Sequence, residues 1–537
     1  MSLQPSDPRA ATHINGACQM TRFTLLSTAA ILATGPAFAQ DLPQSGDTWF
    51  TAAQEAVQAQ LEKQPNTNRA KNVILFVADG NGVGTNYASR LFAGQQEGGL
   101  GDDYVQPHEA FPNVALVKTY STNGQTPDSA PTATAMNAGI KTKNDLINIT
   151  ENVAVSDCAA GLENGVRTFA EIVSEAGKSV GVISTARITH ATPAAVYART
   201  ANRDWEDDTL IPEGCEQLDI AAQLAEQMTS GVIDVAMGGG RQHFLPASAT
   251  DAEGEAGVRG DDRDLTQEIV GDSGAYVQTQ EEFDAIEPGA TPILGLFEAS
   301  HMQYEADRSG EPSLAEMTRA AIEAMQDNEA GFYLEVEAGR VDHANHAGNL
   351  ARTVRDGVAF NEAIALADEL TDDEDTLIIV TADHEHAIAF NGYCGRGSDI
   401  LGLCMMIDEA GTEALDEPNM ASDELPYTVA GFLNGAGSVL VEQMPEPSDN
   451  SQPTAPETGE ASPEEGSPLY SGDRSAIADA DVTDIDYLQQ ALVPMSSETH
   501  SGEDVAVFAK GPFAHLFDGV IEQNVIFHVM HHAATAE

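Results

Sequence analysis

Short apolar runs alternate with longer helical patterns along most of this chain, and this alternation limits the possible folds more than any other feature. The run Asn72–Ala78 has the pattern of a fully buried strand. The pattern then recurs: strands are predicted over 179–184, 232–237, 331–336, 376–381 and 505–509, and helices over 166–176, 220–228, 314–325 and 350–370. Apolar strands joined by helices form a mostly parallel sheet that is covered on both faces. The sequence therefore predicts an α/β fold, a three-layer α/β/α sandwich.

Residues 439–475 interrupt this pattern, because they are rich in Pro, Ser, Glu and Gly and poor in apolar side chains. Such a composition is typical of a solvated surface loop. Together with the segment from Gly392 onward, it predicts a small, crown-like accessory insertion over 392–497. The rest of the chain from residue 40 to residue 537 is predicted to be a single domain.

The first 39 residues have the pattern of a segment that is removed from the mature chain. After Met20, a second candidate start, Arg22 precedes an apolar run over 23–32 and the sequence Ala37-Phe38-Ala39. This is typical of a secretory signal peptide, preceded by an upstream extension over 1–19. No other stretch has the length and apolarity of a membrane span. We therefore expect a periplasmic or secreted chain with no integral membrane segment after cleavage.

Four cysteines follow the predicted cleavage site: Cys158, Cys215, Cys394 and Cys404. An even number in an oxidising compartment suggests two disulfides. Local spacing favours a bond between Cys394 and Cys404, which leaves Cys158 for Cys215. Four unpaired thiols are the alternative.

The chain is strongly acidic, with 25 Lys and Arg against 85 Asp and Glu and a net charge of −60. This charge argues against nucleic acids and anionic membranes as partners. It also repels anionic substrates at long range. A site for an anionic substrate would therefore need locally focused positive charge, from metal ions or arginine.

Carboxylates and histidines follow the predicted strands, at the edge where open α/β sheets place their sites. Asp342 and His346 are four residues apart and would share one face of a helix. The whole set consists of Asp79, Glu337, Asp342, His346, Asp383, His384 and His500. Each residue alone has a common structural explanation, but a parallel sheet brings the ends of its strands together. Mixed carboxylates and imidazoles suit zinc, and an all-oxygen subset suits magnesium.

Asp128-Ser129-Ala130-Pro131 has the pattern of a helix start, since Pro is favoured in the first turn. Ser129 would lie at the helix N-terminus, where backbone N–H groups and the dipole favour an anion. This position suits a nucleophile that attacks a phosphoryl group. The structural alternative is an ordinary helix cap.

From about Lys71 to the C-terminus the chain resembles the alkaline phosphatases, and specifically their animal-type branch. The resemblance is weakest over 245–290 and 405–495. The matching motifs are Asp79-Gly80, Asp128-Ser129-Ala130, Val336-Glu337, Arg340-Val341-Asp342-His343, Thr381-Ala382-Asp383-His384, Glu498-Thr499-His500 and Gly502-Glu503-Asp504.

The resemblance implies a hydrolase of small phosphate monoesters that works through a phosphoserine at Ser129, with two zinc ions and one magnesium ion. The implied ligands are Asp342, His346 and His500 for the first zinc, Asp79, Asp383 and His384 for the second, and Asp79, Thr192 and Glu337 for magnesium. Arg203 matches the arginine that grips phosphate, and we expect Asp128 to orient it. His190 and His386 are expected just outside the ligands, with His190 linked to magnesium through water.

The resemblance also bears on the cysteines, on calcium and on assembly. Cys158 and Cys215 match an animal-type disulfide, whereas Cys394 and Cys404 have no counterpart. Animal relatives carry a calcium site, of which Phe297-Glu298 matches part and Glu311 could supply a further oxygen. The remaining calcium ligand falls in the poorly matched region, so calcium stays an open alternative. A homodimer is the family's usual state.

Two other functions compete with a phosphomonoesterase. A sulfatase or phosphodiesterase of the same superfamily is the first, but the run Ser129-Ala130-Pro131-Thr132-Ala133 lacks the arginine of the sulfatase motif. Arg203 argues against a diesterase, because it would grip a terminal phosphate. An exported, non-catalytic binder of metal or phosphate is the second, and it would need no nucleophile.

Overall fold

The computed structural model describes residues 42–251, 253–271, 274–287, 289–440 and 472–536. The expected signal peptide and upstream extension, 1–39, and most of the loop 439–475 lie outside these ranges. The chain divides into two compact units, residues 1–64 and 65–537. The described part of the first unit holds a 3-10 helix, Pro43–Gly46, and α1 (Thr48–Glu62). Asp47 caps α1 by accepting hydrogen bonds from the backbone N–H groups of Trp49 and Phe50.

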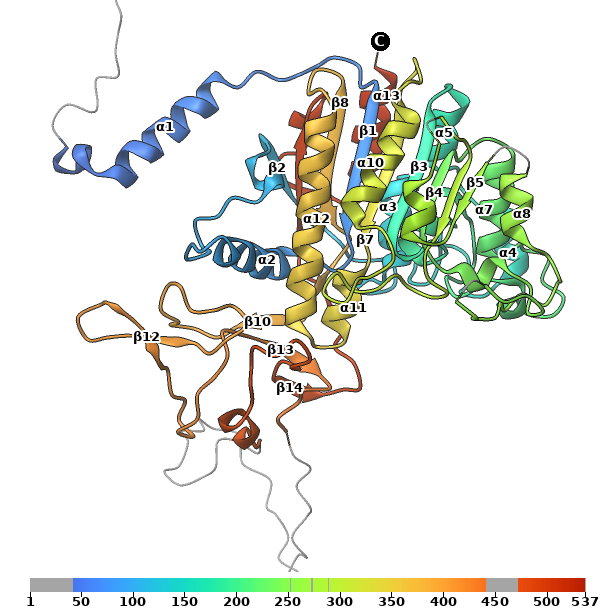
Figure 1. Cartoon of the computed structure of the whole chain (residues 1–537). Coiled ribbons are helices and arrows are strands. Elements are labelled where there is room, and N and C mark those ends of the chain that lie inside the picture. The colour runs from blue at the N-terminus through green and yellow to red at the C-terminus, as the bar shows by residue number, and fades with distance from the viewer. Residues whose placement is uncertain (1–41, 252, 272–273, 288, 441–471, 537) are drawn as a thin grey trace, which may run out of the picture. The chain divides into compact units, whose positions relative to one another are not determined.

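A ten-stranded sheet runs through the second unit (Figure 1). From one edge to the other its strands are β17 (Val520–Glu522), β2 (Asn113–Lys118), β16 (Val505–Lys510), β8 (Thr376–Ala382), β1 (Asn72–Ala78), β7 (Phe332–Ala338), β3 (Ser179–Arg187), β4 (Val235–Gly239), β6 (Ile293–Leu296) and β5 (Ala275–Val277). β16 is antiparallel to both of its neighbours. The other strand pairs described in this sheet are parallel.

Helices cover both faces of the sheet, because β1 is apolar on both sides. Val73, Leu75 and Val77 pack into one buried cluster, and Ile74 and Phe76 pack into another. The first cluster is covered by α3 (Ser129–Ala138), α5 (Phe169–Glu175), α6 (Ala191–Tyr197), α7 (Ile220–Thr229), α8 (Leu265–Val270) and α13 (Val525–Thr535). The second is covered by α10 (Leu314–Met325) and α12 (Leu350–Leu370), which lie in front of the sheet in Figure 1. The predicted three-layer α/β/α sandwich is confirmed.

The remaining helices lie in the connections between the strands and the large helices. They are α2 (Val83–Gln96), α4 (Cys158–Glu163), α9 (Gln280–Asp284) and α11 (Arg340–His346), with 3-10 turns at Pro107–Ala110, Asp208–Leu210, Arg241–Phe244, Ser475–Ala478 and Ala514–Leu516. Across the described residues, no helix is long and apolar enough to cross a bilayer.

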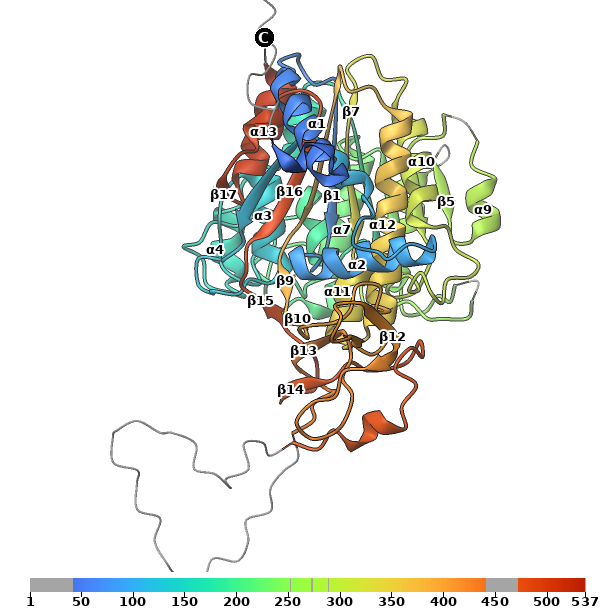
Figure 2. The same cartoon turned by 90° about the vertical axis from the view of Figure 1, so that its left-hand side faces the viewer.

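Three small sheets form between β8 and β16. One has the order β10 (Ile388–Phe390), β13 (Ala430–Gly435) and β14 (Ala491–Pro494), and another pairs β11 (Met405–Ile407) with β12 (Glu413–Pro418). The third pairs β9 (Glu385–His386) with β15 (His500–Ser501). β10, β13 and β14 lie beyond the end of the large sheet at which β1 ends, as Figure 2 shows. The single domain and its insertion over 392–497 stay predictions.

The structure differs from the predicted elements at several boundaries. The strand predicted over 232–237 begins only at Val235, and the helix predicted over 166–176 begins at Phe169. The sequence analysis missed β2, β5, β6 and β17, which are six residues or shorter. β2 has an apolar run of only four residues, 114–117, and two of them, Val114 and Leu116, are exposed.

Candidate metal centre and nucleophile

The predicted site residues meet at the carboxyl end of the sheet. Asp79 directly follows β1, and Asp383 and His384 directly follow the neighbouring β8. Glu337 was expected just past its strand, but it lies within β7, because the pairing of β7 with β1 continues as far as Ala338. Glu337 pairs with Val77, two residues before Asp79, and a ligand atom of Glu337 lies within 4.8 Å of one of Asp79.

Two further segments complete the site. Asp342 and His346 lie on α11, which follows β7 after one residue, and their four-residue spacing places them on one face as predicted. His500 lies on β15 and pairs with His386 of β9 in an antiparallel ladder. This small ladder brings a histidine from the end of the chain to the edge of the large sheet.

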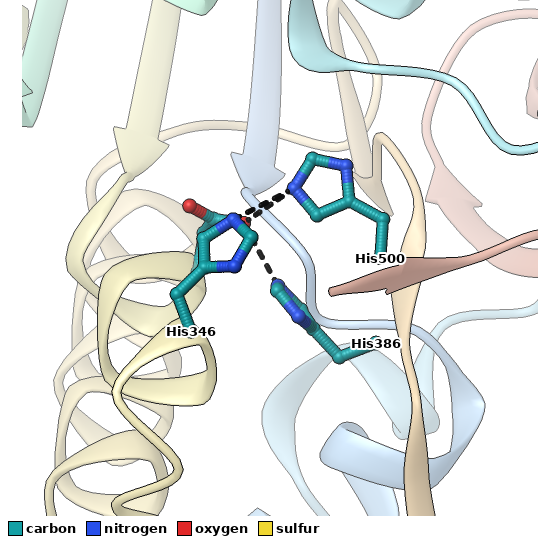
Figure 3. Close-up of side chains that lie close together, drawn as sticks. His346, His386 and His500 are labelled. Atoms are coloured by element: carbon teal, nitrogen blue, oxygen red, sulfur yellow. Dashed lines mark hydrogen bonds and ion pairs between the residues drawn. The ribbon is translucent and has the colours of Figure 1, made fainter. Parts of the chain in front are cut away.

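The first group of candidate ligands consists of Asp342, His346, His386 and His500, each of which offers one ligand atom within 4.8 Å of the others. Oδ1 of Asp342 lies 3.4 Å from Nε2 of His346 and 3.2 Å from Nε2 of His500. The side chains of His346, His386 and His500 come together from α11, β9 and β15 (Figure 3). Two or three imidazoles around one carboxylate are a donor set that suits zinc.

His386 contacts Asp342 through one ring nitrogen and Glu498 through the other. Its Nε2 lies 2.8 Å from Asp342 Oδ1, and its Nδ1 lies 2.5 Å from Oε2 of Glu498. Burial opposes protonation of His386, but the two carboxylates outweigh it and raise its pKa to about 10. A protonated His386 would hold Asp342 through a hydrogen bond rather than bind a metal, in line with its expected place outside the ligands. The sequence analysis quoted Glu498 only as part of a motif and gave it no role.

The second group surrounds Ser129. Asp79, Asp342 and His384 offer ligand atoms within 4.8 Å of one another. Nε2 of His384 lies 3.2 Å from Oδ2 of Asp383 and 3.3 Å from Oδ1 of Asp79. The Ser129 hydroxyl oxygen lies 3.3 Å from both carboxylate oxygens of Asp79 and 3.3 Å from Nε2 of His384. The side chains of Asp79, Asp383 and His384 are fully buried, so the serine faces a closed set of acids and imidazole.

The third group consists of Asp79, His190 and Glu337. Thr192 lies beside it at the start of α6, fully buried. The Thr192 hydroxyl, Oε1 of Glu337 and Nδ1 of His190 are buried and have no hydrogen-bond partner. Buried polar atoms without partners are rare and costly in proteins. A cation that accepts their lone pairs would remove this cost, so the residues fit a bound metal ion.

Mutual repulsion among the acids also favours cations here. Burial, together with the charge of Asp342, raises the pKa of Asp79 to about 7. Burial and the charge of Asp79 raise the pKa of Asp383 to about 7 and that of Glu337 well above its usual range. Asp342 differs, because His346 and the two other histidines outweigh the effect of burial and lower its pKa. Divalent cations would stabilise all of these carboxylates in their ionised form.

Local sequence places Ser129 at the first residue of α3. Asp128 caps the helix by accepting a hydrogen bond from the Ala130 N–H at 2.7 Å, and the helix ends at Gly139 in the left-handed region. All ten residues of α3 are buried, which suits their small side chains. The helix cap and the candidate nucleophile are therefore separate residues, Asp128 and Ser129.

Arg203 lies between Asp128 and His190. Its Nη1 donates to Oδ1 of Asp128 at 3.2 Å, and its Nη2 lies 2.9 Å from Nε2 of His190. This links the arginine both to the helix of Ser129 and to the third group of ligands. Ser184, which the sequence analysis did not single out, donates a short hydrogen bond to Glu337. It follows no motif, and only the register of β3 against β7 places it there.

The residues expected at a calcium site are only partly brought together. Gln303 joins the two acids: its side-chain amide donates to Glu298 at 2.9 Å and its backbone N–H donates to Glu311 at 2.8 Å. Oε2 of Glu311 is buried without a partner, and Phe297 is buried. Within the described ranges, neither acid belongs to a group of three or more candidate ligands.

The four cysteines form two disulfides, in the pairing expected from their local spacing. Cys158 is bonded to Cys215 and Cys394 to Cys404. The first joins α4 to the loop before α7, and the second closes a loop ahead of β11. Both bonds lie outside the three groups of candidate ligands.

Comparison with known proteins finds relatives that match most of the chain. The family model "Alkaline phosphatase" matches residues 70–536. The alkaline phosphatase of Gadus morhua is 39% identical over 504 residues, which cover 90% of this chain and 96% of the relative. The human tissue-nonspecific isozyme of alkaline phosphatase is 38% identical over 505 residues, which cover 90% of this chain and 88% of the relative.

Solved structures show the same fold. The alkaline phosphatase of the Antarctic bacterium TAB5 superimposes with a TM-score of 0.57 at 22% identity, covering 87% of this chain and 99% of its own. The Thermus thermophilus alkaline phosphatase has a TM-score of 0.58 at 22% identity, covering 89% of this chain and 93% of its own. With the family model and the animal relatives, the conclusion is direct: this chain belongs to the alkaline phosphatase family.

Proposed function

We propose that this protein is an exported phosphomonoesterase that hydrolyses a broad range of small phosphate monoesters through a phosphoserine at Ser129. The observation that carries this proposal is the position of the Ser129 hydroxyl. It lies at the N-terminus of α3 and 3.3 Å from both Asp79 and His384. The relatives of this chain are named alkaline phosphatases, which also supports the hydrolysis of phosphate monoesters.

The three groups of candidate ligands suit two zinc ions and one magnesium ion. We assign Asp342, His346 and His500 to the first zinc, Asp79, Asp383 and His384 to the second, and Asp79, Thr192 and Glu337 to magnesium. Asp79 appears in two of the groups found in the structure, as Asp342 does, and this supports the assignment of Asp79 to both the second zinc and magnesium. When bound, such ions lower the pKa of a hydroxyl and neutralise charge on phosphoryl oxygens.

The chain's own residues would then act in order. Arg203, held by Asp128, presents its planar guanidinium to two phosphoryl oxygens. Ser129 passes its hydroxyl proton to Asp79 and forms a bond to phosphorus, while the bond between phosphorus and the ester oxygen breaks. The ester oxygen takes up a proton from water and leaves as the alcohol. Water then attacks the phosphoserine, which releases inorganic phosphate and restores the Ser129 hydroxyl. The N–H groups at the start of α3 stabilise the developing negative charge.

The same arrangement would let a chain with a net charge of −60 bind an anionic substrate. Long-range repulsion of a phosphate ester is overcome only where positive charge is concentrated. Arg203 and the bound cations would concentrate it around Ser129, so we expect binding of monoesters to strengthen as salt screens the rest of the surface.

Location, assembly and calcium are finer parts of the proposal. Two disulfides favour an oxidising compartment, which is consistent with a periplasmic or secreted enzyme. We propose a homodimer as the family's usual state. A calcium ion at Phe297, Glu298 and Glu311 is supported by the unpartnered Oε2 atom of Glu311.

One experiment separates this function from its alternatives. The purified chain is assayed on a chromogenic phosphate monoester and on the matched diester, before and after chelation and after zinc and magnesium are restored. We expect monoester turnover that chelation abolishes and metals restore, with the diester far slower. Equal or faster diester turnover would indicate a phosphodiesterase, and metal binding without turnover would indicate a non-catalytic binder.

A further inference from the structure

We propose that Glu385, Thr85 and Asn345 form a buried polar brace that fixes the spacing of three segments that carry metal ligands. The inference rests on the proposed function, since the residues that the brace positions are the ligands assigned above. The three are positioning residues: among the described residues Glu385 belongs to no group of candidate ligands, and the side chains of Thr85 and Asn345 bond to Glu385 and to each other. They lie in three segments that are far apart in the sequence.

Each member of the brace is close in sequence to proposed ligands. Thr85 lies in the first turn of α2, which follows Asp79 and its loop. Glu385 lies on β9, between His384 and His386. Asn345 lies on α11, between Asp342 and His346. The brace therefore connects the segments that carry the ligands of both proposed zinc sites.

A continuous chain of hydrogen bonds joins the three side chains. The Thr85 hydroxyl donates to Oε1 of Glu385 at 3.2 Å and accepts from the side-chain amide of Asn345 at 3.5 Å. One hydroxyl can serve both bonds, because it has one proton and two lone pairs. The Thr353 hydroxyl of α12 lies 3.3 Å from Oδ1 of Asn345, but its shorter hydrogen bond is to the Asn349 carbonyl at 2.9 Å, so the chain ends at Asn345. Thr85 and Asn345 are fully buried and Glu385 is 5% exposed, so water does not compete for these bonds.

Glu385 also caps α2 from outside that helix. The residue at the usual cap position is Gly82, which has no side chain to offer. Oε2 of Glu385 takes its place by accepting from the Gly84 N–H at 2.7 Å. A Cβ atom on Gly82 would lie 2.4 Å from the same oxygen, so the absence of a side chain there makes room for the carboxylate. A negative charge at this end of a 14-residue helix is also favoured by the helix dipole.

The cap has a consequence for Asp79. The loop from Asp79 to Gly84 is tied twice to the segment after β8: the Gly80 N–H donates to Asp383 at 3.0 Å, and the Gly84 N–H donates to Glu385. Asp79, shared by two of the proposed sites, is thus held against Asp383 and His384 from both ends of its loop. Removal of the Glu385 carboxylate would free one end, and the spacing of the second zinc site would loosen. Residues that orient metal ligands typically change metal affinity 10- to 100-fold when they are replaced.

The experiment compares Glu385→Ala with Glu385→Gln in the full-length protein. Gln keeps an oxygen that accepts from the Gly84 N–H, so it should keep the cap of α2. Its amide nitrogen cannot accept from the Thr85 hydroxyl and the His386 N–H, which both donate to Oε1 of Glu385, so Gln should restore the brace only in part. Thr168→Ala is the matched control, because Thr168 is a fully buried cap of α5, which carries no proposed ligand. Zinc affinity is measured by competition with a chelator, and thermal unfolding is measured with and without zinc.

We expect Glu385→Ala to bind zinc at least 10-fold more weakly, Glu385→Gln to lose less zinc affinity than Glu385→Ala because it keeps the cap of α2, and Thr168→Ala to keep its zinc affinity while its unfolding temperature falls. Unchanged zinc affinity in Glu385→Ala would overturn the brace, as would equal losses in Glu385→Ala and Thr168→Ala. If Glu385→Ala does not fold, Thr85→Val with Thr85→Ser as its conservative partner gives the same comparison. A wild-type chain that binds no zinc or turns over no monoester would instead overturn the proposed function.

Discussion

The carboxylate of Asp128 binds the guanidinium of Arg203, with 3.2 Å between Oδ1 and Nη1. Asp128 is itself held in place: Oδ1 also accepts from the Ala130 N–H, and Oδ2 accepts from the Asp145 N–H, each at 2.7 Å. One side chain therefore caps the helix of Ser129 and orients the arginine beside it. These contacts support the proposal that Asp128 positions Arg203 rather than acting as a general base.

Asp128→Ala should weaken phosphate binding without abolishing turnover. The guanidinium would lose a charged hydrogen bond, which typically contributes about 1.5–3 kcal/mol. We expect the inhibition constant of inorganic phosphate and the KM of a monoester to rise roughly 10-fold or more, while kcat falls only a few-fold. Steady-state kinetics with phosphate as inhibitor measures this. Complete loss of activity in a variant whose zinc content is intact would contradict it.

Arg203→Lys should be far from conservative. Lysine keeps the charge but lacks the planar fork that contacts two oxygens at once. It would also lose one of the two contacts, to Asp128 or His190, that hold the arginine. We expect kcat/KM for a monoester to fall by about 100-fold, and the drop should be much smaller for a matched diester, which has no terminal phosphate to grip. Equal losses for both substrates would argue against this role.

Asp356→Asn should stabilise the protein increasingly as pH rises. Burial raises the pKa of Asp356 to about 8, whereas an unfolded aspartate titrates near its ordinary value of about 4. Between those values the native state holds a proton that the unfolded state has lost, so the wild type loses stability as pH increases, by up to ~1.4 kcal/mol per pH unit. Asparagine does not titrate, so the stability of the Asp356→Asn variant does not fall with pH for this reason.

Chemical unfolding of both proteins at pH 5 and pH 8 measures the effect. The stability of Asp356→Asn relative to the wild type should be greater at pH 8 than at pH 5. A relative stability that is the same at both pH values would show that Asp356 has its ordinary pKa in the folded protein.

The two disulfides should contribute unequally. The Cys158–Cys215 bond spans 57 residues and the Cys394–Cys404 bond spans 10, and a longer closed loop restricts the unfolded chain more. Loop-closure entropy gives roughly 4 kcal/mol for the first and roughly 3 kcal/mol for the second. Replacing each pair by serine should therefore lower the unfolding temperature more for Cys158 and Cys215, and the initial rates of both variants at 25 °C should stay near that of the wild type. The reverse order of unfolding temperatures would contradict the entropic account.

Most of the fold could be predicted from continuous apolar runs. β1, α10 and α12 have the predicted bounds, because a buried strand or an amphipathic helix has a strong sequence pattern. β2 and β17 could not be found in this way, since they are short and half exposed. The antiparallel direction of β16 is set by long-range pairing with β2 and β8, which no local pattern encodes.

In the candidate site, too, some residues could be predicted from local sequence patterns and others could not. Asp79, Asp383 and His384 follow strands and could be found from strand ends alone. Thr192, Arg203 and His190 came only from the resemblance, because no spacing in the sequence links them to the acids. Ser184, Glu385 and Asn345 contact the site or its supports through strand register and helix packing. Such contacts depend on the folded arrangement, so the sequence alone did not indicate them.

The most direct test of the account is acid-quenched labelling of Ser129. The protein, loaded with zinc and magnesium, is mixed with a phosphate monoester, quenched in acid, digested and analysed by mass spectrometry. We predict phosphate on the peptide that contains Ser129, and no phosphorylated peptide and no turnover in Ser129→Ala, whose metal content and fold should match the wild type. Ser129→Ala that hydrolyses the monoester at the wild-type rate, or phosphate trapped on another residue, would contradict the account.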